Sequence, residues 1–318
     1  MTKYIPLWIK VPLSVLLKDH GKWPPGLVLA HMYRAFAETS KCGENTKQQA
    51  WHFVQNQTYS YLRKHYGHVV QNQNVSLGNK AEHAPVWVFW WQGEHKAPVL
   101  VQRCLQSMRR HASDHPVYVI DQHNYLDFVS IPDHITAKLE SGLISLTHFS
   151  DYLRMALLAK YGGLWLDATI FVSAPLDTCF ADDFFTVRNP GLEKENISHW
   201  EWSVFAIGGN AGNSLFTQVR DLLSVYWKEN DRLIDYYVFD YMVRLVVDSC
   251  PTVQNVLNSV KPNNPNIYFY QHHFNDAADL MPPIDTWLYK LSWKGTYNTT
   301  TPAGEETVYS RWLHDISE

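Results

Sequence analysis

The fold of this chain is decided by the stretch Ser150-Asp-Tyr-Leu-Arg-Met-Ala-Leu-Leu-Ala-Lys-Tyr-Gly-Gly-Leu-Trp-Leu-Asp-Ala-Thr-Ile-Phe-Val172. Its first half is made of strong helix formers, with Ser150 as the N-cap and Asp151 in the first turn, where the helix dipole favours an acid. The glycines at 162–163 end the helix. Residues 164–172 then alternate as a strand. The stretch therefore predicts a helix that leads directly into a strand.

This helix and strand bring chemically useful side chains together. On a strand, Trp165, Asp167 and Thr169 share one face. Asp167 could hold a hard divalent cation on a diphosphate, Arg154 could grip the phosphate oxygens, and Asp151 could bind ribose hydroxyls. These are the needs of sugar transfer from a nucleoside diphosphate. The plainer alternative stays open from the pattern alone: a helix-start acid paired with Arg154, and a strand-end acid.

The surrounding sequence alternates between strands and helices. Short apolar runs of β-forming residues predict buried strands at 86–91, 117–120 and 143–146. Helical stretches are expected from Pro98 to Arg110 and over 133–141. This alternation predicts an α/β fold with a doubly wound, mostly parallel sheet. No GxGxxG follows the first strand, which disfavours a dinucleotide site.

The chain is expected to have two parts. Residues 1–70 look helical and aromatic, and the polar stretch 71–79 is a linker, so we predict an N-terminal helical segment at 1–80 and an α/β domain at 81–318. The interrupted apolar stretch at 4–17 is either a peripheral membrane contact or a segment docked on the core.

Composition narrows the class of protein. The chain has 318 residues, 46% of them hydrophobic, and a net charge of −4, which argues against nucleic-acid binding. Its 4 cysteines form no CxxC pair, so a reducing compartment, the cytoplasm, is expected. Aromatic residues reach 14%, which suits stacking on sugars or bases but suits a thick core equally well.

The motif Ser150-Asp-x-x-Arg154…Tyr161-Gly-Gly-x-Trp165-x-Asp167-Ala-Thr169 resembles the DXD-containing sugar transferases, which have the GT-A fold. Within that superfamily it is most similar to the bacterial capsular polysaccharide synthesis glycosyltransferases. Further blocks match at 88–93, 235–241, 264–266 and 289–294. The resemblance covers about residues 83 to 295.

The resemblance implies a GT-A-like, Rossmann-type sheet flanked by helices, a UDP-sugar donor and Mn²⁺ or Mg²⁺. It implies transfer of a hexose or N-acetylhexosamine, with retention, onto a lipid-linked oligosaccharide in capsular or surface polysaccharide synthesis. By motif position, Asp151 would contact the ribose, Arg154 the phosphates, and Asp167 the metal and ribose. The uracil would lie near Phe89, Trp90 or Trp91. A C-terminal segment that contains Ser292 and Trp293 would close over the diphosphate.

One position departs from the family pattern. Thr169 stands where the last acid of DXD, often the direct metal ligand, is expected. A hydroxyl is a weaker ligand, so Asp167 and Thr169 would hold a metal weakly unless another group such as His314 completes the sphere. The departure also keeps open a catalytically silent sugar-nucleotide-binding subunit of a polysaccharide assembly complex.

Asp240 is the remaining candidate. It lies in an apolar run, where a carboxylate needs a partner or a role. It either contacts the acceptor or forms an ion pair with Arg244, its i+4 neighbour. In a retaining transfer the acceptor hydroxyl would attack on the leaving-group side. The alternative is a covalent intermediate on a carboxylate, for which Asp240 is the candidate. A glycoside hydrolase, which cleaves without a nucleotide, is disfavoured because the acids cluster with an arginine.

Overall fold

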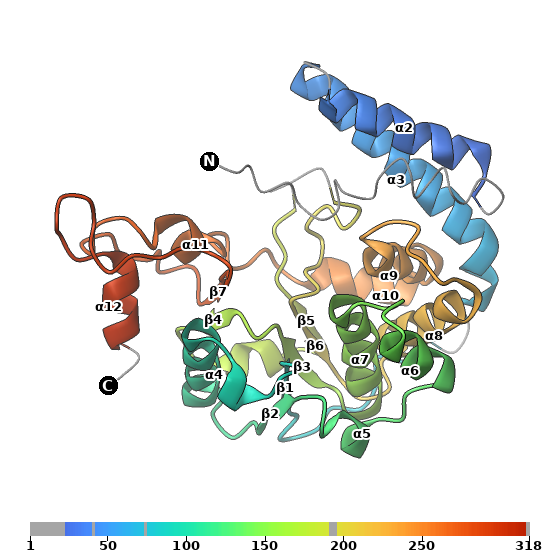
Figure 1. Ribbon diagram of the computed structural model, residues 1–318. Helices are drawn as coiled ribbons and strands as arrows, with labels where there is room; N and C mark the ends of the chain where they lie inside the picture. Colours follow the sequence, from blue (N-terminus) through green and yellow to red (C-terminus); the bar gives the residue numbers. More distant parts are fainter. Residues whose placement is uncertain (1–22, 40–41, 73–74, 191–195, 316–318) are drawn as a thin grey trace.

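A five-stranded sheet forms the centre of the molecule (Figure 1). The computed structural model describes residues 23–39, 42–72, 75–190 and 196–315. β1 pairs in parallel with β2 and with β3, whereas β6 is antiparallel to both β3 and β5, so only β6 runs against the other four. The strands, in their spatial order, are β2 (Val117–Ile120), β1 (Val86–Phe89), β3 (Gly163–Leu166), β6 (Ala206–Gly209) and β5 (Phe184–Thr186).

Helices cover both faces of this sheet, which is why its strands are continuously apolar. Trp165 of β3 packs into one hydrophobic cluster, while Leu164 and Leu166 pack into the other. The second cluster includes α4 (Val99–His111). The first includes three helices: α7 (Leu146–Tyr161), α8 (Ser214–Glu229) and α9 (Val238–Ser249). The predicted α/β class, with a mostly parallel sheet flanked by helices and a helical N-terminal segment, is confirmed.

A second, two-stranded sheet lies beside the first. β4 (Ile170–Val172) pairs antiparallel with β7 (Leu288–Lys290), and Ile170 lies opposite Lys290. In Figure 1 this sheet leads to the C-terminal lobe that carries α11 (Phe269–His273) and α12 (Val308–Asp315). This second sheet brings residues 288–290, from the C-terminal part of the chain, next to β4.

The N-terminal part is a helical hairpin. α2 (Pro25–Thr39) and α3 (Glu44–Tyr66) pack on each other, and α3 also contacts α9. The boundary near residue 80 stays a prediction, and the apolar stretch 4–17 lies outside the described residues. No helix within the described ranges has the length and apolar character to cross a membrane.

The remaining elements are short connections. They are the α-helices α5 (Tyr125–Phe128), α6 (Asp133–Glu140) and α10 (Pro251–Ser259), and the 3-10 turns η2 (Gly67–Val69), η3 (Glu94–Lys96) and η4 (Leu176–Phe180). The helices predicted at 98–110 and 133–141, and the strand predicted at 117–120, are confirmed within a residue.

Two predictions around the deciding helix are wrong. The strand expected at 143–146 is a turn and the start of α7, because Ser145 caps the helix and its hydroxyl accepts a hydrogen bond from the His148 N–H at 3.3 Å. Ser150 is therefore not the N-cap; its hydroxyl donates to the Thr147 carbonyl at 2.6 Å inside the helix. Asp151 consequently lies in the second turn of α7, not the first.

The continuous strand expected over 164–172 is also wrong. The chain turns sharply after β3, because the Ile170 N–H donates to the Asp167 carbonyl at 2.8 Å. Asp167 thus follows the last residue of β3, and Ile170 begins β4 in the other sheet. Since the turn breaks the alternation, Asp167 and Thr169 do not share a strand face.

Candidate active site

A cavity of about 410 Å³ lies beyond the carboxyl end of β3, beside the first half of α7. The motif places Asp151, Arg154 and Asp167 in its wall, and Asp240 joins them from α9. The other described residues that line it are mostly hydroxyl-bearing or aromatic: Thr147, His148, Ser150, Asn196, Ser198, Trp200, Trp202, Ser203, Val204, Phe205, Tyr236, Tyr237, Phe239, Tyr268 and Lys290.

Asp167 is the centre of the charged cluster. Its Oδ2 accepts a hydrogen bond from the Lys290 Nζ at 2.6 Å. Its Oδ1 accepts one from the Trp165 Nε1 at 3.0 Å and lies 3.5 Å from an Arg154 Nη. With 30% of its side chain exposed, Asp167 is the most accessible of these charged groups. Sequence reasoning found its proximity to Arg154 but missed Lys290.

Arg154 links the two carboxylates contributed by the motif. One Nη donates to Asp151 at 2.9 Å and the other faces Asp167. Its guanidinium also lies over the rings of Trp165 and Phe239, at 4.7 and 5.2 Å from their centroids. Only 3% of the side chain is exposed. Arg154 is therefore held rigidly, and it organises the acids from within the wall.

The two motif acids have different electrostatic environments. Burial raises the pKa of the Asp151 carboxyl, although the Arg154 guanidinium opposes this. Burial alone would also raise the pKa of Asp167, but the charges of Lys290 and Arg154 outweigh it and lower that pKa. Asp167 is consequently ionised at neutral pH, and it contacts two cations, one of which it shares with Asp151.

Asp240 does not pair with Arg244, so that alternative is wrong. Trp202 lies between them: its Nε1 donates to Asp240 at 2.9 Å, and its ring carries the Arg244 guanidinium at 4.6 Å. Arg244 instead pairs with Glu201 at 2.7 Å and Asp248 at 3.7 Å. Burial, partly offset by the Trp202 hydrogen bond, raises the pKa of Asp240 to about 7. Asp240 is therefore a carboxyl in the cavity wall that can gain or lose a proton near neutral pH.

The aromatic residues predicted near the uracil do not line this cavity. Phe89 and Trp91 pack on Phe149 of α7, with ring centroids 6.1 and 5.9 Å apart. Trp91 lines a neighbouring cavity of about 500 Å³, together with Tyr125 of α5. This second cavity also adjoins the N-terminus of α7, since Ser145 and Leu146 line it.

Trp90 and Trp293 form a third group. Their rings meet edge to face at 5.8 Å, and Trp293 is 46% exposed. Ser292 precedes it, and its carbonyl accepts a hydrogen bond from the Tyr297 hydroxyl at 2.7 Å. The structure thus brings the end of the first strand and the C-terminal block together. Their roles toward a nucleotide stay predictions.

The residues present are a poor fit to the divalent cation that the resemblance implies. Thr169 is 9% exposed and lies outside the cavity lining, and its carbonyl accepts from the Leu291 N–H at 2.9 Å. Across the described ranges no group of three or more His, Cys, Asp or Glu could hold a metal. His314, on α12, does not line the cavity either. A single carboxylate can hold Mg²⁺ with help from phosphates, but both oxygens of Asp167 are already engaged.

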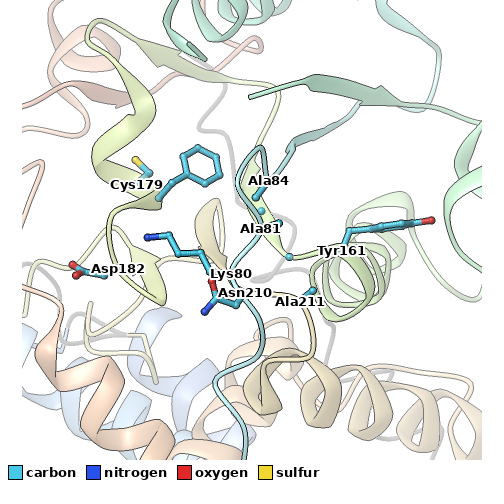
Figure 2. A pocket seen from close by; sticks show the side chains of 12 residues that line it. Lys80, Ala81, Ala84, Tyr161, Cys179, Asp182, Asn210 and Ala211 are labelled. Atoms are coloured by element: carbon cyan, nitrogen blue, oxygen red, sulfur yellow. The ribbon is translucent and has the colours of Figure 1, made fainter. Parts of the chain in front are cut away.

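A small cavity of about 20 Å³ at the amino end of β3 is a weaker candidate. Figure 2 shows Lys80, Cys179 and Asp182 around it, with Asn210 and Ala211 beside them. The Lys80 Nζ donates to the Ala181 carbonyl at 2.8 Å. This space is about that of one water molecule, so it results from the packing of loops.

A protein-family model matches most of the chain. The family described as capsular polysaccharide synthesis protein matches residues 39–312. The O-glycosyltransferase braB of Annulohypoxylon truncatum is 31% identical over 96 residues, which cover 27% of this chain and 23% of that protein. The chain thus spans less than a quarter of that relative's length.

Two solved structures match the chain at a TM-score of 0.41 and 11% identity. The PaToxG glycosyltransferase is matched over 73% of this chain and 84% of that chain. The apo structure of the bifunctional glycosyltransferase WbbM is matched over 78% and 52%, respectively.

Proposed function

The chain belongs to the capsular polysaccharide synthesis protein family, whose pattern spans residues 39–312, and from this premise we propose that it is a glycosyltransferase. The proposed reaction moves a hexose or N-acetylhexosamine from a UDP-sugar to a lipid-linked oligosaccharide, with retention at the anomeric carbon. The enzyme would work at the cytoplasmic face of the membrane, where residues 4–17 would provide a peripheral contact.

One observation carries the proposal. A helix and the strand that follows it bring Asp151, Arg154 and Asp167 into one charged cluster at the edge of a cavity. The cluster lies beyond the carboxyl end of a parallel strand, where α/β sheets bind their ligands. A buried arginine between two acids is also a rigid arrangement, and rigidity is what charge stabilisation of a transition state requires.

The size and lining of the cavity support a sugar substrate. About 410 Å³ is within the range of small-molecule sites. The walls combine hydroxyl-bearing side chains, which can bond to sugar hydroxyls, with exposed aromatic faces such as Tyr236 at 39% exposure. These walls, which include Trp200, Trp202 and Tyr268, are a feature that sequence reasoning did not assign. The "Asp-Tyr-Tyr" block at 235–237 was the available signal.

In the proposed transfer, the bond between the anomeric carbon and the diphosphate oxygen breaks, and its electron pair goes to the leaving UDP. The acceptor hydroxyl oxygen forms the new bond to the same carbon from the same side. Its proton passes to the departing diphosphate oxygen. Catalysis is then mainly positioning and charge stabilisation. Asp151 and Asp167 would position the ribose, and Asp240 would contact the acceptor hydroxyl.

A thermal-shift panel with UDP, GDP and CMP, each with and without Mn²⁺, tests the proposal. UDP at about a hundred times its Kd would add about 2.7 kcal/mol of stability, a shift of several degrees in Tm. UDP release from UDP-hexoses and UDP-N-acetylhexosamines, measured in parallel, should detect hydrolysis of the donor. The proposal fails if no nucleotide stabilises the chain and no UDP-sugar is consumed under any of these conditions.

The second candidate is the catalytically silent sugar-nucleotide-binding subunit. It is favoured by Thr169, which lies off the cavity where an acid would complete the DXD motif. This subunit would also be stabilised by UDP. It would release no UDP from any donor, even when a mixture of oligosaccharide acceptors is added.

A further inference from the structure

We propose that Lys290 supplies the positive charge that stabilises the leaving diphosphate, so that this chain transfers sugar without a divalent cation. The inference rests on the proposed function, because it concerns the diphosphate of the same donor. It assigns to a lysine the task that the DXD pattern gives to a metal held by acids.

The first step is that Asp167 is already occupied. Its Oδ2 is 2.6 Å from the Lys290 Nζ, and its Oδ1 receives the Trp165 N–H at 3.0 Å with Arg154 at 3.5 Å. A divalent cation bound to either oxygen would share that oxygen with a protein donor and lie close to two positive side chains. Like charges that close repel strongly where water is scarce. The Asp167 carboxylate is thus surrounded by the protein's own cations, Lys290 and Arg154.

The second step is that Lys290 is built into the site. It ends β7, where it lies opposite Ile170, and its N–H donates to the Ile267 carbonyl at 2.8 Å. The next N–H along the chain, that of Leu291, donates to the Thr169 carbonyl at 2.9 Å. The turn that takes Thr169 away from the cavity therefore creates the strand edge that holds Lys290. The same backbone arrangement therefore takes position 169 out of the cavity lining and brings a cation into it.

The third step concerns which cationic side chain the diphosphate of a bound sugar donor could reach. Both Arg154 and Lys290 line the cavity, and they are its only lysine or arginine residues among those that the structure describes. Arg154 is 3% exposed and directs both terminal nitrogens at carboxylates, whereas Lys290 is 21% exposed. The Lys290 Nζ also lies 5.3 Å from the centroid of the Phe205 ring, a further contact that fixes it. Lys290 is thus the cation available to an incoming diphosphate.

The charge balance agrees with this assignment. Arg154 and Lys290 together match the charges of Asp151 and Asp167 before any ligand binds. When the donor's carbon–oxygen bond breaks, its electron pair goes to the β-phosphate oxygen. Lys290, which has three N–H donors, can keep its bond to Asp167 and donate another to that oxygen. The acceptor's proton then neutralises the same oxygen, so the step requires no proton from Lys290.

Calorimetric titration of UDP, and of GDP in parallel, into the full chain tests the inference in EDTA and again in Mn²⁺. The wild-type chain should bind UDP equally well in both. Lys290→Met should weaken binding in EDTA on the order of tenfold to a hundredfold, the worth of a charged hydrogen bond, and Mn²⁺ should restore part of it, because Asp167 is then free to take a metal. Lys290→Arg should keep metal-independent binding. Lys261→Met, which removes an exposed charge elsewhere, should match the wild type.

The outcomes separate the two proposals. Binding that requires Mn²⁺ in the wild type and is unchanged in Lys290→Met overturns the role of Lys290 but leaves the glycosyltransferase intact. Absence of binding to UDP and GDP in both solutions overturns the proposed function itself. A matching Tm for the wild type and Lys290→Met establishes that a weaker affinity reflects the lost charge, and Lys290→Arg provides the same comparison if Lys290→Met is unstable.

Discussion

The two ends of strand β3 are built for different purposes. At the carboxyl end, Asp167 meets Arg154 and Lys290 beside a cavity of about 410 Å³. At the amino end, Gly162 and Gly163 lie against neighbouring backbone, beside a cavity of about 20 Å³. A Cβ on Gly163 would come within 2.1 Å of the Pro85 carbonyl oxygen, and one on Gly162 within 2.5 Å of a backbone nitrogen.

This difference divides the motif Tyr161-Gly-Gly-x-Trp-x-Asp167 into two functions. Both glycines have positive φ, +66° and +97°, and the Leu164 N–H donates to the Pro85 carbonyl at 2.8 Å. They allow α7 to end and β3 to start in close contact with the chain before β1. The glycines are therefore needed to form the sheet, whereas Asp167 is placed by that sheet to do chemistry.

The most severe way to break the amino end is Gly163→Ala. The new methyl group clashes with backbone that cannot move independently, and φ is unfavourable for alanine, so we expect a loss of about 4 kcal/mol or more in the free energy of unfolding. Urea unfolding measures it. Gly142→Ala is the matched control: φ is +74° but nothing lies within 4 Å, so strain alone should cost about 1 kcal/mol. Equal costs would show that the close approach to Pro85 is unimportant.

At the carboxyl end, Asp167→Asn should lower the activity strongly and change the stability little. Loss of the charge that aligns Lys290 and Arg154 should lower the rate of UDP-sugar consumption about a hundredfold. An amide oxygen can still accept from Trp165, so stability should change by only about 1 kcal/mol. Asp182→Asn, an exposed acid beside the amino-end cavity, is the control and should leave the rate unchanged. If the two variants lose the same activity, the proposed division between the two ends is incorrect.

Much of the carboxyl end could be predicted from the sequence, because it depends on local periodicity. A helix, a glycine stop and a strand are legible in one stretch, and their succession forces Asp151, Arg154 and Asp167 together. Boundaries were less accessible. Ser145 and Ser150 are both acceptable N-caps, and only packing selects the first. The turn after Asp167 was equally hidden, since residues 164–172 alternate well enough for a single strand.

Two of the contacts that sequence reasoning missed are long-range. Lys290 reaches Asp167 across 123 positions, and this requires β7 to pair with β4. Trp202 comes between Asp240 and Arg244 from 38 positions away, so the helical i,i+4 spacing of those two residues was misleading. Neither partner carries a local signal, because a lysine on a strand or a tryptophan in a loop is ordinary until the tertiary fold places it.

Asp240 gives the smallest expected effect in the comparison of the two ends of β3. It lines the cavity at the carboxyl end, and a buried charge there would lower the stability of the fold. Burial raises its pKa to about 7, whereas in the unfolded chain an aspartate titrates near about 3.9. As pH rises through that window, the unfolded chain releases the proton first, so the folded chain loses stability with increasing pH. Asp240→Asn cannot ionise but still accepts from Trp202. Its Tm should equal that of the wild type near pH 4 and exceed it by about 2 °C or more at pH 8, measured by calorimetry, while Asp182→Asn should show no such gap. A gap that stays constant with pH would mean that Asp240 is ionised in the folded chain, and hence that the wall of the cavity tolerates this charge at no cost.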